Sequence, residues 1–158
     1  GALLRLAERM TPAAAPPALK IEVAAASARS LMDEGQGRAA LERMSALERD
    51  PALAGADFPP SWRRLKAMCA VHAGALGLAR ETLEELRERH PADPESREAL
   101  PLLGLLYESQ AAADEARRCY ALYLAGSPSG AGAPEWVRER ERALRQEFFP
   151  PPRALKKY

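Results

Sequence analysis

One pattern of spacings constrains this chain more than any other feature, because it recurs three times along the sequence. A small residue is followed after seven positions by a second small residue, and after five more by an alanine. Larger apolar residues stand four and seven positions beyond that alanine, and a proline closes each block. The three sets are Ala28, Gly35, Ala40, Met44, Leu47 and Pro51; Ala67, Gly74, Ala79, Leu83, Leu86 and Pro91; and Gly104, Ala111, Ala116, Tyr120, Tyr123 and Pro128.

These spacings are typical of two antiparallel helices that pack closely together. Small residues are needed where two helix backbones approach each other, which explains the first-helix Ala or Gly and the second-helix Ala. The larger apolar residues beyond that alanine fill the space between neighbouring units. Proline lacks the N–H that would continue a helix, so it ends each block. The sequence therefore predicts a series of helix pairs.

Helical patterns fill most of the chain, whereas alternating strand patterns and hairpin-turn dipeptides are nearly absent. Asp93-Pro94-Glu95 is a typical helix start, with Asp as the N-cap and Pro at the first helical position. Gly35 and Gly74 stand between paired helices, where a tight turn needs a permissive backbone. We expect helices over residues 18–34, 37–49, 61–73, 76–90, 95–109, 112–125 and 134–148.

The third block resembles the tetratricopeptide repeat, a helix-turn-helix unit of about 34 residues. The residues that carry this resemblance are Leu103, Gly104, Tyr107, Ala116, Tyr120 and Pro128. The middle block matches the family pattern through Ala67, Gly74, Ala79 and Pro91, and the first block is the most degenerate. The resemblance covers about residues 18–128 and implies an all-α, right-handed α-solenoid of three units, residues 18–51, 61–91 and 95–128.

The two ends of the chain fit the same scheme. Residues 2–10 and Pro12 repeat the second-helix spacing, so residues 1–17 are interpreted as the remnant second helix of an earlier unit plus a Pro-rich linker. Residues 134–149 form an amphipathic helix that would cap the solenoid, with Trp136, Val137, Leu144 and Phe148 on one side. Residues 150–158 are expected to form a basic, extended tail.

In proteins of this family the first helices line a concave groove that binds other proteins, and the resemblance implies the same use here. The groove would hold an extended peptide or an amphipathic helix of some acidic character, since methionines adapt to varied partners and arginines flank them here. As an alternative, any of the groove side chains named below could pack only against neighbouring helices and make no contact with a partner. The predicted groove residues are Arg29, Met32, Asp33, Arg64, Met68, Val71, His72, Leu105, Glu108 and Ser109.

One variant of the groove in this family clamps the C-terminal carboxylate of heat-shock chaperones with a Lys-Asn-Asn-Lys-Arg set. The corresponding positions here are Ala25, Arg29, Leu65, Glu98 and Leu102, so a receptor for chaperone tails is disfavoured. We expect a non-catalytic protein-interaction module, a scaffold or assembly factor. The alternative is a structural subunit of a secretion or pilus-assembly machinery, which would form homodimers through the exposed N-terminal edge.

No catalytic, metal or cofactor site is expected. Cys69-x-x-His72 has half the pattern of a zinc site, but no second ligand pair lies nearby in the sequence, and no carboxylate stands where it would orient the pair for catalysis. Residues 126–132 are glycine-rich but lack the lysine of a phosphate-binding loop and read as a linker. Residues 138–142 alternate Arg and Glu, which is typical of a solvated helix face rather than a nucleic-acid contact.

Composition narrows the classes of partner and compartment. With 23 basic and 22 acidic residues the net charge is +1, which gives no electrostatic reason to expect nucleic acid or an anionic membrane. No apolar run reaches the ~20 residues needed to span a bilayer. The two cysteines, Cys69 and Cys119, favour a reducing, cytoplasmic setting, with the periplasm left open for a chain cut from an exported precursor. High Ala, Arg and Gly usage suggests a bacterial genome.

Overall fold

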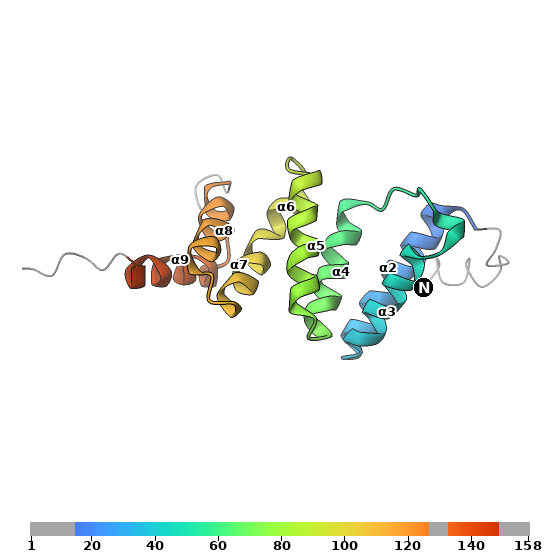
Figure 1. Ribbon diagram of the computed structural model, residues 1–158, viewed down its shortest axis with the longest axis horizontal. Helices are drawn as coiled ribbons and strands as arrows, with labels where there is room; N and C mark the ends of the chain where they lie inside the picture. The colour runs from blue at the N-terminus through green and yellow to red at the C-terminus, as the bar shows by residue number, and fades with distance from the viewer. Residues whose placement is uncertain (1–14, 127–132, 149–158) are drawn as a thin grey trace, which may run out of the picture. The chain divides into compact units, whose positions relative to one another are not determined.

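The computed structural model describes residues 15–126 and 133–148, and these residues form helices and turns without any strand, which confirms the all-α fold class. The chain divides into two compact units, Gly1–His90 and Pro91–Tyr158. Figure 1 shows the helices, which are α2 (Pro17–Asp33), α3 (Gly37–Glu48), the 3₁₀ helix η2 (Pro51–Leu53), α4 (Pro60–His72), α5 (Leu76–Arg89), α6 (Pro94–Glu98), α7 (Leu100–Ser109), α8 (Ala113–Ala125) and α9 (Glu135–Phe148).

Some predicted features lie outside the described residues. They are the remnant helix over 2–10, the glycine-rich loop beyond Gly126 with Pro128, and the basic tail over 150–158. Within the described helices, none is both long enough and apolar enough to cross a membrane.

The predicted helix over residues 95–109 is divided in the structure into α6 and α7, whereas every other predicted helix within the described residues begins and ends within one residue of its prediction. The division lies at Ala99, just before Pro101, which occupies the first turn of α7. The Pro101 ring nitrogen has no hydrogen to donate to the carbonyl one turn earlier, so the helical ladder is interrupted there. The backbone nevertheless stays helical at Ala99, with φ −77° and ψ −22°.

The turns inside the three helix pairs have the same backbone geometry. Gly35, Gly74 and Ala111 occupy the equivalent positions of the sequence pattern, and their φ angles are 74°, 75° and 57°. In each turn this residue donates its N–H to the carbonyl three residues earlier, and the next residue donates to the carbonyl five residues earlier, at 2.7–3.0 Å. The first helix of each pair therefore ends in a Schellman-type cap, and the two glycines provide the permissive backbone that was predicted for these turns. Ala111 adopts the left-handed conformation despite its Cβ, which is uncommon for a residue other than glycine.

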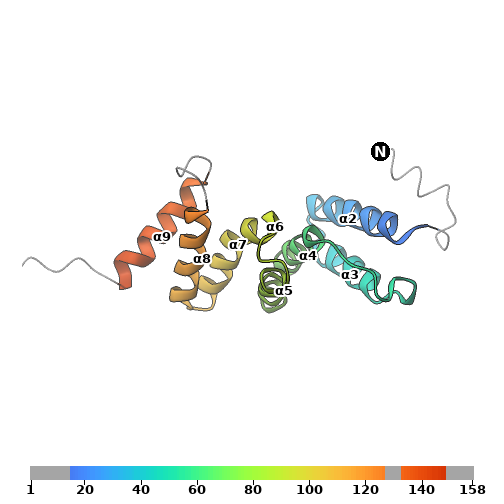
Figure 2. The same ribbon diagram turned by 90° about the horizontal axis from the view of Figure 1, so that it is seen from above.

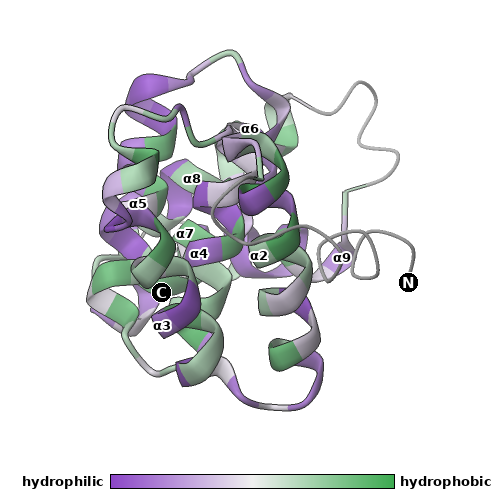
Figure 3. Ribbon diagram, turned by 90° about the vertical axis from the view of Figure 1, so that its right-hand side faces the viewer, coloured by the Kyte–Doolittle hydropathy of each residue, from purple (hydrophilic) through white to green (hydrophobic). Residues whose placement is uncertain are grey.

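The N-terminal unit is built from α2–α5, in which each helix packs against the next and α2 also reaches α4 (Figures 1 and 2). The alanines of the sequence pattern, Ala28, Ala40, Ala67 and Ala79, are fully buried, as close helix packing requires. Hydrophilic and hydrophobic residues both occur along α3 and α5 (Figure 3), and the buried positions of each helix recur at three- or four-residue spacing, as at Ala40 and Met44, so each helix has an inward and an outward face. One cluster of this core contains Ile21, Ala24, Ala28, Ala40, Met44, Trp62, Leu65 and Cys69.

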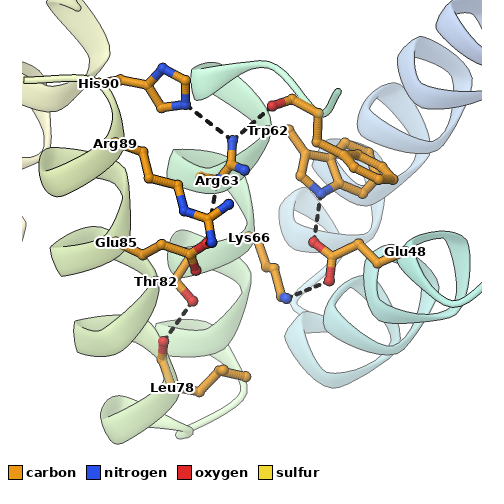
Figure 4. A network of polar contacts seen from close by, with 10 residues as sticks. Glu48, Trp62, Arg63, Lys66, Leu78, Thr82, Glu85, Arg89 and His90 are labelled. Atoms are coloured by element: carbon orange, nitrogen blue, oxygen red, sulfur yellow. Dashed lines mark hydrogen bonds and ion pairs between the residues drawn. The ribbon is translucent and has the colours of Figure 1, made fainter. Parts of the chain in front are cut away.

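Polar side chains also join α3 to α4 in this unit. The Trp62 Nε1–H donates to Glu48 Oε1 at 2.9 Å, and the Lys66 ammonium lies 2.5 Å from Glu48 Oε2 (Figure 4). On the other side of α4, Arg63 donates to the Phe58 carbonyl at 2.8 Å and lies 3.5 Å from His90 Nε2. The ion pair with Lys66 holds the Glu48 carboxylate in place. The hydrogen bond from the indole to that carboxylate in turn fixes the orientation of Trp62.

The C-terminal unit packs α7 against α8 and α8 against α9. The α7 backbone approaches α8 so closely that a Cβ placed on Gly104 would lie within 2.9 Å of three atoms of the Tyr120 ring. Val137 and Leu144 of α9 are buried, while the half-exposed Trp136 meets the edge of Tyr120 at a centroid distance of 6.2 Å. The apolar side predicted for α9 is therefore present at Val137 and Leu144, with Trp136 at its margin.

Candidate functional site

A hollow of about 380 Å³ lies between α2 and α4 in the N-terminal unit. We call it the α2–α4 hollow. These helices are the first members of two successive helix pairs, so the hollow lies where a first-helix groove is expected. Its lining consists of Ile21, Glu22, Ala25, Ala26 and Arg29 from α2, with Ser61 and Trp62 from α4.

The shape of the hollow follows from residue size and helical spacing. Ala25 and Ala26 follow Glu22 by three and four residues, and Arg29 follows them by four and three, so the four residues share one face of α2. The two alanines leave space that larger side chains would fill. On the α4 side, the Trp62 ring is only 2% exposed and is held by Glu48 and by the Phe58 ring at a centroid distance of 5.1 Å. One wall of the hollow is therefore rigid and aromatic.

The rim of the hollow carries one charge of each sign. Glu22 and Arg29 are both exposed and lie two helical turns apart on α2. Neither forms an ion pair with another side chain among the residues that the structure describes. The Glu22 carboxylate and the Arg29 guanidinium are thus free to contact a bound molecule. Ser61, which is also exposed, adds a hydroxyl at the start of α4.

The predicted groove residues of the N-terminal unit lie in different surroundings. Arg29 lines the hollow. Met32 is half-buried and packs on the core cluster, and on α4 the side chains of Arg64, Met68 and Val71 are half-buried while His72 is exposed. The His72 backbone also lies against Gly37, where an added Cβ would be 2.7 Å from the His72 carbonyl carbon. The exposed Asp33 is at the end of α2.

In the C-terminal unit, Leu105 is 38% exposed and Ser109 is exposed, whereas Glu108 takes part in a network that joins three helices. The Tyr120 hydroxyl donates to Glu108 Oε1 at 2.5 Å, and Arg140 Nη2 of α9 lies 2.6 Å from Glu108 Oε2. Burial, followed by the neighbouring Glu108 carboxylate, raises the pKa of the Tyr120 hydroxyl, so it remains a donor. The Glu108 carboxylate is thus already bound by α8 and α9.

Sequence reasoning missed most of the lining, above all Trp62 and Ala26. The stripe that contains Ala25 and Arg29 could have been extended to Glu22 and Ala26 by helical spacing alone. Trp62 gave no such signal, because its position beside α2 depends on how two helix pairs pack.

Among residues 15–126 and 133–148, no group of three or more His, Cys, Asp or Glu side chains is arranged to hold a metal ion. Burial raises the pKa of the Cys69 thiol to about 11, so it is protonated and weakly nucleophilic near neutral pH.

Comparison with known proteins gives no family model that matches this chain, and no curated protein matches its sequence.

Proposed function

We propose that this chain is a non-catalytic protein-interaction module of tetratricopeptide-repeat type, acting as a scaffold or assembly factor, and that the α2–α4 hollow receives a segment of a partner protein. The observation that carries the proposal is the position of the hollow, between the first helices of two successive pairs. The shared turn geometry at Gly35, Gly74 and Ala111 supports a repeated helix-pair unit. A solenoid of three such units is part of the proposal.

The lining indicates what kind of segment would bind. Ala25, Ala26 and the Trp62 ring offer an apolar pocket for one large aliphatic or aromatic side chain. Arg29 would pair with a carboxylate on the same segment, and Glu22 would disfavour a second carboxylate nearby. Because Arg29 lies about one helical turn from the two alanines, the expected ligand is a peptide or helix with one apolar anchor and one acidic residue about one turn, or about two extended residues, away. Arg64, Met68, Val71 and His72 of α4 would extend the contact surface.

The proposal is tested by selecting binders from a displayed peptide library with the whole chain and then comparing variants. Ala26→Phe should fill the hollow and Arg29→Glu should repel the acidic residue, so each should weaken the selected peptides by about tenfold or more. The matched control is Arg43→Glu, which makes the same charge change at an exposed position on α3. All variants should keep the circular dichroism of the parent.

Two results would count against the proposal. Peptides that bind Ala26→Phe and Arg29→Glu as tightly as the parent would place the site elsewhere. A library that yields no binder, together with sedimentation that shows concentration-dependent self-association, would favour the alternative of a self-associating structural subunit.

A further inference from the structure

Three sulfur atoms from three helices lie together in the N-terminal unit. The Cys69 Sγ of α4 is 3.1 Å from Met32 Sδ of α2 and 3.7 Å from Met44 Sδ of α3. Cys69 and Met44 are fully buried, and Met32 is half-buried beside them. We call these three residues the sulfur cluster. Met32 and Met44 are 12 residues apart in the sequence, and Met44 and Cys69 are 25 residues apart.

The donor atoms of the cluster are all soft. Thiolate and thioether sulfurs are the ligands preferred by Cu(I), whereas magnesium, calcium and manganese prefer oxygen. Zinc sites are usually completed by several cysteines, histidines or carboxylates, and no group of three such side chains occurs in the described residues. The cluster therefore discriminates against the common divalent ions by the chemistry of its donors.

The separations of the sulfurs are close to those needed around one ion. Two sulfur ligands at about 2.3 Å from a metal lie roughly 3.8–4.6 Å apart when the angle between them is between tetrahedral and linear. The Cys69–Met44 distance of 3.7 Å lies within about 0.1 Å of the lower limit. The Cys69–Met32 distance of 3.1 Å must widen by roughly 0.7 Å, which a flexible thioether at the margin of the core can supply.

Charge further selects a monovalent ion. Without a metal the thiol carries its proton, which it directs towards the methionine sulfurs that lie 3.1 and 3.7 Å away. When Cu(I) binds, the S–H bond breaks, the proton leaves to solvent and a Cu–S bond forms, so the site stays neutral with no change of oxidation state. A divalent ion that displaces the same single proton would leave one positive charge among apolar residues, which is costly.

The cluster also has a route to solvent. Met44 and Cys69 are enclosed, but Met32 is half-buried near the end of α2. Met32 is therefore the member of the cluster that lies nearest to solvent. We propose that Met32, Met44 and Cys69 form a binding site for one soft monovalent metal ion, Cu(I) under reducing conditions. This site is separate from the α2–α4 hollow and does not depend on the proposed function.

The test is an anaerobic titration of the whole chain with Cu(I) in competition with a chromogenic Cu(I) chelator. The parent should bind one equivalent, release one proton per ion near neutral pH and give an X-ray absorption spectrum with sulfur ligands only. Loss of residues that merely support metal ligands typically costs 10–100-fold in affinity, so loss of a ligand should cost at least about tenfold. That weakening is expected for Cys69→Ala, Met32→Leu and Met44→Leu.

The controls separate this site from other sulfurs in the chain. Met68→Leu and Cys119→Ala make the same chemical changes outside the cluster and should leave the affinity unchanged. The Leu substitutions conserve volume, so Met32→Leu with Met44→Leu tests the site even if Cys69→Ala fails to fold. Copper held equally well by that double variant, copper lost in Cys119→Ala, or a parent that yields all copper to the chelator would each overturn the proposal.

Discussion

At the scale of single residues, Cys69 shows how burial changes the acidity of a thiol. Its side chain is enclosed by the helices of the N-terminal unit and is fully buried. Loss of contact with water disfavours the thiolate and raises the thiol pKa from 9.0 to about 11, against a smaller opposing effect of a backbone hydrogen bond. In the unfolded chain the thiol returns to its ordinary pKa. Between these two values the folded state holds a proton that the unfolded state has lost.

This difference predicts that Cys69 makes folding less favourable in alkali. Because the folded state binds more protons between pH 9 and pH 11, the free energy of unfolding falls as the pH rises through this window. From pH 8 to about pH 10.5, Cys69 should contribute a loss of up to about 2 kcal/mol. Urea unfolding of the parent and of Cys69→Ala at both pH values measures this contribution. Equal losses in the two proteins would show that the thiol titrates normally when folded.

At the scale of helices, the α7–α8 pair depends on the absence of a side chain at Gly104. The Tyr120 ring occupies the space that a Cβ at this position would need. The same ring is tied by its hydroxyl to Glu108 of α7 and meets Trp136 of α9, so it cannot easily move aside. A glycine inside a helix normally costs about 1 kcal/mol relative to alanine. Here that cost is offset by the close approach of the two helices.

Gly104→Ala should therefore destabilise the protein, although alanine is the better helix former. Overpacking of a close contact costs about 1–3 kcal/mol, which outweighs a propensity gain of up to about 1 kcal/mol. The matched control is Gly77→Ala in α5, where nothing lies within 4 Å of the added Cβ. This variant should be as stable as the parent or slightly more stable. Thermal unfolding followed by circular dichroism distinguishes the two. A rise in melting temperature for Gly104→Ala would show that Tyr120 gives way.

At the scale of the whole molecule, the parts that sequence could predict are those set by spacing along one chain segment. Helix bounds, glycine turns and the buried alanines follow from local spacing. The interruption before Pro101 also had a local cause, in the missing N–H. No local sequence pattern could predict that Trp62 forms a wall of the hollow or that Met32, Met44 and Cys69 converge. Both features depend on contacts between different helices. Tertiary packing therefore created the features from which both proposals are drawn.

The register common to the helix pairs yields a prediction that concerns both units. Ala79 in the N-terminal unit and Ala116 in the C-terminal unit occupy the same position of the pattern, and both are fully buried. A long charged side chain at either position would overpack the helix contact and bury an unpaired charge, at a cost of roughly several kcal/mol. Ala79→Arg and Ala116→Arg should each abolish cooperative thermal unfolding or lower its midpoint strongly.

Ala121 supplies the matched control for this register, since it lies in α8 with Ala116 but is exposed. Ala121→Arg makes the identical change of residue on the outer face, where arginine is a good helix former, so its melting curve should stay close to that of the parent. A shared register requires the two buried substitutions to be severe and the exposed one to be mild. If Ala116→Arg and Ala121→Arg melted alike, the α8 face that packs on α7 would have been assigned wrongly. If only Ala79→Arg were mild, the pattern would fail to extend to the α4–α5 pair.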